Sequence, residues 1–279
     1  MTQTLVSPRS PSSQAFRFSK KALKRIIPLA VIAYFFHRAL IVYAAFGLLD
    51  VIRNRPLTAS LTYRYFLGNG LLTWLLSPFN LFMDLICLPY WNKGIYQLTD
   101  LPERYQAEIQ TLIDAAHSRN LVGALEAKMG EKKRGMIFFQ WYGKILESSV
   151  DIPEYRQRYK YIRTIGVSIF NKKQSTDRHF GPTRVTFRVL YNINTIEDPN
   201  VYVKVGDVVH RWKDEKLFIF DDTLQHESHN ESDGLRYCLF VDILRPSFVP
   251  WALSAVVTGI RLVAAPVRAV FYKNWTFIK

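Results

Sequence analysis

The chain has 279 residues, of which 49% are hydrophobic and 14% aromatic, and it carries a net charge of +14. This composition supports a buried core and excludes a disordered chain, while the charge favours an anionic partner, either nucleic acid or an anionic membrane. The only cysteines are Cys87 and Cys238, which excludes a disulfide framework and a CxxC zinc ribbon.

The N-terminal part combines a basic tail with two apolar runs. We expect residues 1–25 to form a disordered basic tail, because five basic residues lie in "RFSKKALKR" and Ser, Thr, Gln and Pro dominate the segment before it. The apolar runs at 26–49 and 66–91 predict membrane-associated helices over 26–92. Polar residues interrupt both runs, so a transmembrane hairpin, interfacial helices and buried helices of a soluble protein all stay open. The interruptions are His37, Arg38, Asn69, Pro78, Asn80 and Asp84.

Residues 93–135 predict a helical lead-in to the next domain. Apolar residues recur at helical spacing in "DLPERYQAEIQTLIDAAHSRNLVGALEAKM", which has an acidic first turn. We expect one or two amphipathic helices there. The aromatic segment 136–147, which follows, fits either a strand or a buried helix.

Residues 136–247 predict a mainly β domain. Short β-branched or alternating runs are separated by turns such as "VGD" and "SDG", a pattern typical of a sandwich or jelly roll. The expected strands are 164–170, 183–193, 201–205, 216–222 and 235–244. Residues 248–279 contain no acidic residue and predict an amphipathic basic C-terminal helix, either on a membrane or packed on the domain.

Two histidines flank strands of this β domain. His179 precedes the run "TRVTFRVLYNI", and His226 follows "KLFIFDD". In a jelly roll, loops from neighbouring strands converge at one open mouth, where two imidazoles could share a metal. The carboxylate of the usual facial triad would lie two residues after His179, but that position is Gly181.

The segments "HFGPTRVTFR" and "FDDTLQHESHNESDGLRYCLFVDILRP" resemble the aspartyl/asparaginyl β-hydroxylase family, including its lipid A and ornithine-lipid hydroxylase branch. The resemblance covers about residues 136–247 and implies a double-stranded β-helix that uses Fe(II) and 2-oxoglutarate. It implies two iron ligands without a carboxylate, His179 and His226.

The same resemblance implies a cosubstrate site formed by Ser168, Arg188 and Arg236. An arginine fork suits a carboxylate of 2-oxoglutarate, since it donates two parallel hydrogen bonds. From the residues alone, an ion pair with Asp221, Asp222 or Asp242 explains either arginine equally well.

One position departs from the family pattern. Leu190 stands where the family usually has a second histidine two residues after the strand arginine, and positions 188 and 190 share one face of a strand. The sequence therefore leaves open weaker 2-oxoglutarate binding, a rearranged pocket or a non-catalytic descendant. We expect an active enzyme, because both histidines and both arginines are present. His117, His210 and His229 are expected to be packing or surface residues, although His229 could also line the mouth.

These features predict a membrane-associated dioxygenase that hydroxylates a lipid acyl chain at the cytoplasmic face of a bacterial inner membrane. The alternatives are a protein aspartyl/asparaginyl hydroxylase and a non-catalytic hydroxylase-like membrane protein. We expect a lipid substrate and a membrane as partners. Nucleic acid is not expected, because the basic residues cluster beside apolar runs without a recognition motif. The sequence does not indicate an oligomeric state.

Overall fold

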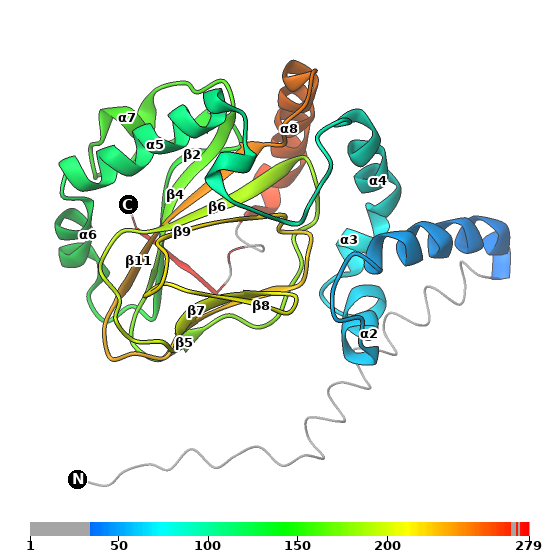
Figure 1. Cartoon of the computed structure of the whole chain (residues 1–279), viewed down its shortest axis with the longest axis horizontal. Coiled ribbons are helices and arrows are strands. Elements are labelled where there is room, and N and C mark those ends of the chain that lie inside the picture. Colours follow the sequence, from blue (N-terminus) through cyan, green and yellow to red (C-terminus); the bar gives the residue numbers. More distant parts are fainter. Residues whose placement is uncertain (1–33, 269–271, 273, 279) are drawn as a thin grey trace, which may run out of the picture.

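The β domain consists of two mostly antiparallel sheets. The computed structural model describes residues 34–268, 272 and 274–278 (Figure 1), so the tail predicted over 1–25 lies outside the described residues. The larger described sheet has the strand order β1 (Ile95–Tyr96), β9 (Leu217–Phe220), β6 (Thr186–Asn192), β11 (Arg236–Leu244), β4 (Ile162–Phe170), β2 (Arg134–Trp141) and β12 (Thr276–Phe277), and β3 (Lys144–Ile145) pairs with β2. The smaller sheet has the order β5 (Gln174–Ser175), β10 (His226–Asn230), β7 (Val201–Val205) and β8 (Val208–Arg211).

The strand order is that of a jelly roll. From β4 to β11 the chain passes back and forth between the sheets, and only β7 and β8 are consecutive neighbours within one sheet. The first and last of these strands, β4 and β11, pair antiparallel in the middle of the large sheet. This arrangement is a double-stranded β-helix. The prediction of a mainly β domain is confirmed.

Alternating side chains on each strand divide the core into two layers. On β6 and β11, Leu190 and Phe240 belong to the layer between the sheets, whereas Val189 and Leu239 belong to the layer beneath the helices. This is the two-residue period of a strand with both faces covered. The covering helices are α5 (Glu103–Ser118), α6 (Leu121–Met129) and α7 (Pro153–Arg156), on one side of the large sheet in Figure 1.

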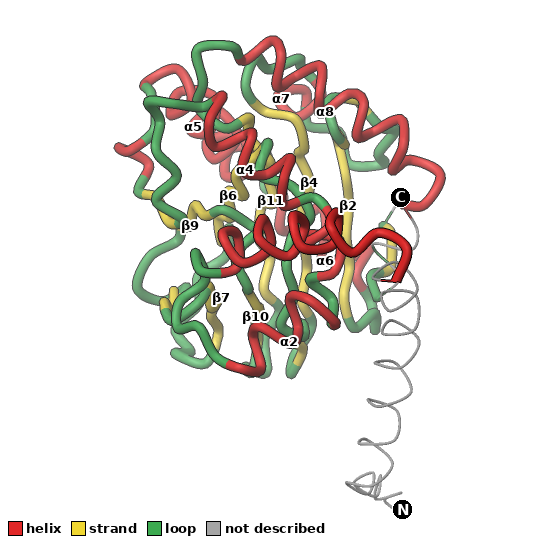
Figure 2. The backbone as a smooth tube through the Cα atoms, turned by 90° about the vertical axis from the view of Figure 1, so that its right-hand side faces the viewer, coloured by secondary structure: helices red, strands yellow, loops and turns green. Residues whose placement is uncertain are grey.

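A second group of helices lies at another side of the β domain, as Figures 1 and 2 show together. We call residues 34–92 the N-terminal helical region. Its helices are Tyr34–Val51, α2 (Ala59–Leu67), α3 (Leu71–Leu75) and α4 (Ser77–Ile86). In the described part of the chain, Tyr34–Val51 is the one helix with the length and apolar composition to cross a membrane. The apolar run at 66–91 is divided among shorter helices. The C-terminal helix α8 (Pro250–Ala264) shares a small core with α4.

The N-terminal helical region buries polar side chains and exposes apolar ones. Asp50, Asn54, Thr73 and Asn80 are at most 3% exposed. Large apolar side chains on the same segments are exposed, namely Leu48, Leu49, Ile52, Leu72, Leu75, Phe82 and Leu85. The region also has a small buried apolar cluster of Val51, Leu61, Tyr65 and Trp74. It therefore exposes more large apolar surface than a helix on a soluble protein usually does.

Candidate metal and cosubstrate site

The fold brings the two predicted histidines together. His179 lies in the loop between β5 and β6, and His226 is the first residue of β10. The two backbones form an isolated antiparallel bridge, in which each amide nitrogen donates to the other residue's carbonyl oxygen at N···O distances of 3.0 and 2.9 Å. Their ring centroids are 4.2 Å apart. Residues 47 positions apart in the sequence thus place their imidazoles side by side.

Local hydrogen bonds fix the same tautomer in both rings. Nδ1 of His179 lies 2.7 Å from the carbonyl oxygen of Asp177, and Nδ1 of His226 lies 2.8 Å from that of Leu224. A carbonyl only accepts, so each Nδ1 carries the proton and each Nε2 keeps its lone pair. Burial lowers the pKa of both histidines, which favours neutral imidazole. Two neutral rings with free Nε2 atoms fit the donor set for a divalent transition metal.

The described residues contain no third side chain to complete a metal cluster: no group of three or more His, Cys, Asp and Glu residues is arranged to hold a metal. At Gly181, where a triad carboxylate would stand, a Cβ would overlap the carboxylate of Asp222. The Gly181 N–H also donates to the Asp222 carbonyl at 2.6 Å. A side chain at position 181 would therefore force the Asp222 carboxylate, which pairs with Arg188, to move. With two histidines and no third ligand among the described residues, a metal here would keep open positions for other ligands.

Arg236 is a buried cation without an acidic partner among the described residues. Its side chain projects between the sheets and is 2% exposed. Its guanidinium donates to the hydroxyls of Ser228 at 2.6 Å and Ser168 at 3.3 Å, and it lies 4.2 Å from the ring centroid of Phe170. Nε has no hydrogen-bond partner, and burial lowers the pKa of this arginine. A buried guanidinium surrounded by hydroxyls is the environment that a carboxylate would complete.

Arg188, the second predicted arginine, is already neutralised. It pairs with Asp242 at 2.7 Å and with Asp222 at 2.9 Å. Burial alone would lower the pKa of Arg188, but the two carboxylates outweigh it and raise the pKa. Burial raises the pKa of Asp222 to about 7, although Arg188 opposes the shift. The two arginines therefore differ: Arg188 has the ion pairs that its residue type alone suggested, and Arg236 does not.

Comparison with known proteins identifies related sequences over the β domain. Residues 132–246 match the model of the family described as aspartyl/asparaginyl beta-hydroxylase. This segment is therefore similar to the aspartyl/asparaginyl β-hydroxylase family. The chain is also 33% identical over 104 residues to an ornithine lipid ester-linked acyl 2-hydroxylase from Rhizobium tropici. That match covers 35% of this chain and 37% of the relative, so the chain spans little more than a third of that protein.

Two solved structures show a distant likeness to this chain. A 2OG-Fe(II) oxygenase family oxidoreductase from Burkholderia pseudomallei is 16% identical with a TM-score of 0.32, covering 47% of this chain and 80% of that one. A prolyl hydroxylase from Trichoplax adhaerens, solved with a hypoxia inducible factor peptide, is 16% identical with a TM-score of 0.27, covering 34% and 47%. The strand order itself identifies the jelly roll.

The remaining histidines of the β domain have local partners. His210 stacks on Phe218 with centroids 4.4 Å apart. His229 stacks on Tyr202 at 4.6 Å and lies 3.4 Å from two glutamates. Outside the domain, His117 contacts the Tyr191 hydroxyl at 2.9 Å. All three agree with the packing roles expected for them.

Ser228 is a polar residue of the interior that the sequence prediction missed. It lies two residues after His226 on β10, and its hydroxyl accepts from Arg236. The two-residue period of a strand could have identified it, because His226 and Ser228 share one face. Leu190 is buried in the interior cluster with Phe240. An apolar side chain therefore occupies the position at which the resemblance predicts a histidine.

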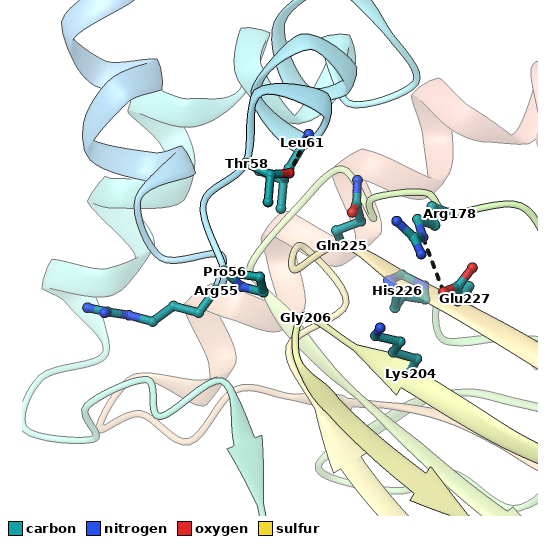
Figure 3. A pocket seen from close by; sticks show the side chains of 10 residues that line it. All are labelled: Arg55, Pro56, Thr58, Leu61, Arg178, Lys204, Gly206, Gln225, His226 and Glu227. Atoms are coloured by element: carbon teal, nitrogen blue, oxygen red, sulfur yellow. Dashed lines mark hydrogen bonds and ion pairs between the residues drawn. The ribbon is translucent and has the colours of Figure 1, made fainter.

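A hollow of about 90 Å³ borders His226 on the side of the N-terminal helical region (Figure 3). Its lining is mostly polar and carries three cations and one acid. The acid, Glu227, already pairs with Arg178 at 3.2 Å. In Figure 3 the Arg55 side chain extends away from His226. The lining residues are Arg55, Pro56, Thr58, Leu61, Arg178, Lys204, Gly206, Gln225, His226 and Glu227.

Proposed function

We propose that this protein is a membrane-associated hydroxylase that uses Fe(II) and 2-oxoglutarate to hydroxylate an acyl chain of a lipid. One observation carries the proposal. Arg236 is buried without an acidic partner, and it bonds Ser228 on the same strand face as His226, whose Nε2 is free. A metal ligand and a carboxylate receptor therefore face one interior, as a chelating keto acid requires.

Each residue then has a definite task. His179 and His226 offer Nε2 to the metal, and their Nδ1 bonds to backbone carbonyls hold the rings in orientation. Arg236, with Ser168 and Ser228, receives a carboxylate of 2-oxoglutarate. Leu190 and Phe240 exclude water from the interior. When bound, iron and 2-oxoglutarate supply the oxidation: dioxygen and the keto acid yield succinate and carbon dioxide while one C–H bond becomes C–OH.

The surface supports a lipid substrate. Exposed large apolar side chains gather on the N-terminal helical region and on α8, where Trp251, Leu262 and Val263 are each at least 68% exposed. Apolar surface of this extent marks an interaction site, and the net charge of +14 suits an anionic leaflet. The Rhizobium relative's name points to the same substrate class. We place the protein at the cytoplasmic face of a bacterial inner membrane, where Fe(II), 2-oxoglutarate and anionic lipid would meet.

Turnover by the purified full chain tests the proposal. The protein, in nanodiscs of bacterial lipid, is supplied with Fe(II), ascorbate, 2-oxoglutarate and dioxygen. Succinate release is measured, and the lipids are analysed by mass spectrometry. We expect one added oxygen on an acyl chain, loss of that product in His226→Ala, and retention in His229→Ala, which alters a surface histidine three residues away. Oxygen incorporation into an Asp- or Asn-containing peptide, with none into lipid, would assign the activity to protein substrates instead.

A further inference from the structure

Polar contacts from the N-terminal helical region hold the loop that carries His179. The Thr73 hydroxyl donates to the carbonyl of Gly181 at 2.9 Å. The Asn80 side chain donates to the carbonyl of Pro182 at 3.2 Å and accepts the N–H of Arg184 at 2.9 Å. All three contacts lie within five residues of His179.

The loop before His226 is held from the same region. Asn54 accepts the N–H of Gln225 at 2.8 Å, next to the candidate ligand itself. Asp221, four residues further back, accepts from Arg53 at 3.0 Å and from Asn92 at 2.7 Å. Both loops therefore depend for part of their backbone hydrogen bonding on side chains that lie at least 102 residues earlier in the chain.

Arg184 ties the two loops together. Its guanidinium is fully enclosed and contacts three carboxylates from three separate segments. Asp50 comes from helix Tyr34–Val51, Asp84 from α4 at 2.6 Å, and Asp221 from the loop before His226 at 3.5 Å. Such a buried set of ion pairs favours one arrangement, because displacing any member leaves a charge unpaired in the interior.

We propose that the N-terminal helical region is a positioning element of the metal site, and that Thr73, Asn80 and the Arg184 network set the relative placement of His179 and His226. The inference rests on the proposed function, since it assigns these residues to the metal site. Metal ligands tolerate displacements of only about 0.2 Å, so the supporting contacts affect metal affinity without touching the metal.

Two conservative variants of the full chain test this role. Thr73→Val removes only the hydroxyl that holds Gly181, and Asp50→Asn neutralises the remote partner of Arg184. Thr111→Val is the matched control, because its hydroxyl also donates to a carbonyl at 2.9 Å but lies on α5, away from the site. The readouts are Co(II) affinity by calorimetry, and hydrogen exchange of the amides at 178–184 and 221–226.

We expect Co(II) affinity to fall about tenfold in Thr73→Val and Asp50→Asn, with faster exchange in both loops, and no change in Thr111→Val. If the parent binds Co(II) and neither variant alters affinity or loop exchange, the positioning role is refuted. If the parent binds no Co(II) while loop exchange still rises in the variants, the proposed function is refuted, but the N-terminal helical region still holds the two loops in place. Asn80→Asp, which keeps the side-chain shape but removes the donor to Pro182, gives a third variant should Asp50→Asn not fold.

Discussion

Replacing Arg236 or Arg188 with methionine should affect the free energy of unfolding very differently. In Arg236→Met, the protein loses hydrogen bonds to two neutral hydroxyls and is relieved of a buried cation without an acidic partner. These effects offset each other, so without 2-oxoglutarate we expect the free energy of unfolding to change by no more than about 1 kcal/mol. In Arg188→Met, Asp222 and Asp242 lose their common partner, and we expect a loss of about 3–5 kcal/mol.

The ligand dependence follows from the same contacts. At a concentration of 2-oxoglutarate 100 times its Kd, the parent gains about 2.7 kcal/mol of stability. Loss of two charge-assisted hydrogen bonds in Arg236→Met costs at least about 3 kcal/mol of binding, or about 150-fold in Kd. The same concentration then stabilises the variant by only about 0.3 kcal/mol.

Thermal denaturation with Co(II), with and without 2-oxoglutarate, measures both effects. We expect the ligand to raise the parent midpoint by about 5–10 °C and the Arg236→Met midpoint by about 1 °C or less. An Arg236→Met protein that keeps the full shift would show that the carboxylate binds elsewhere, and Arg188 would then be the next arginine to test. A variant destabilised by several kcal/mol without ligand would mean that the two serine hydroxyls compensate this cation fully.

Three further outcomes follow from single positions. Leu190→His restores a polar group on the strand face of Arg188, and isothermal calorimetry should show 2-oxoglutarate binding severalfold more tightly than in the parent. Burial lowers the pKa of His210 to about 4. The stability that the neutral imidazole contributes is therefore present above about pH 6.5 and is lost as the pH falls toward 4. His210→Phe keeps the stack on Phe218, so its thermal midpoint should fall less on acidification than that of the parent. Leu85→Ser removes an exposed apolar side chain, and vesicle co-sedimentation should weaken by about tenfold if α4 contacts lipid.

The sequence predicts the β domain well because its strands have locally readable patterns. The expected strand at 201–205 is β7, and those at 164–170 and 235–244 are β4 and β11 with minor shifts at the ends. The segment 136–147, ambiguous by composition, contains strand β2, whose residues are buried on both faces and so show no alternation. The expected run 183–193 starts too early: β6 begins at Thr186, and Arg184 lies in the preceding loop.

The sequence predicts only those residues of the candidate site that stand in short local motifs. His179, His226 and Arg236 stand in short motifs, and the fold brings them to one interior. The partners of Arg184 could not be found in this way, because Asp50 and Asp84 are 134 and 100 residues away in the chain. Nothing in the local pattern around Arg184 distinguishes it from Arg188, which pairs instead with Asp222 and Asp242.

The polar residues that interrupt the second apolar run acquire a meaning from the structure. In the sequence, Asn80 and Asp84 weaken the prediction of a simple transmembrane helix. In the structure, they lie on the side of α4 that bonds Arg184, while Phe82 and Leu85 are exposed. A helix in water would gain nothing from exposing these large side chains. This two-sided arrangement supports our proposal of membrane association, in which the apolar side would meet lipid while the polar side bonds the loops of the candidate metal site.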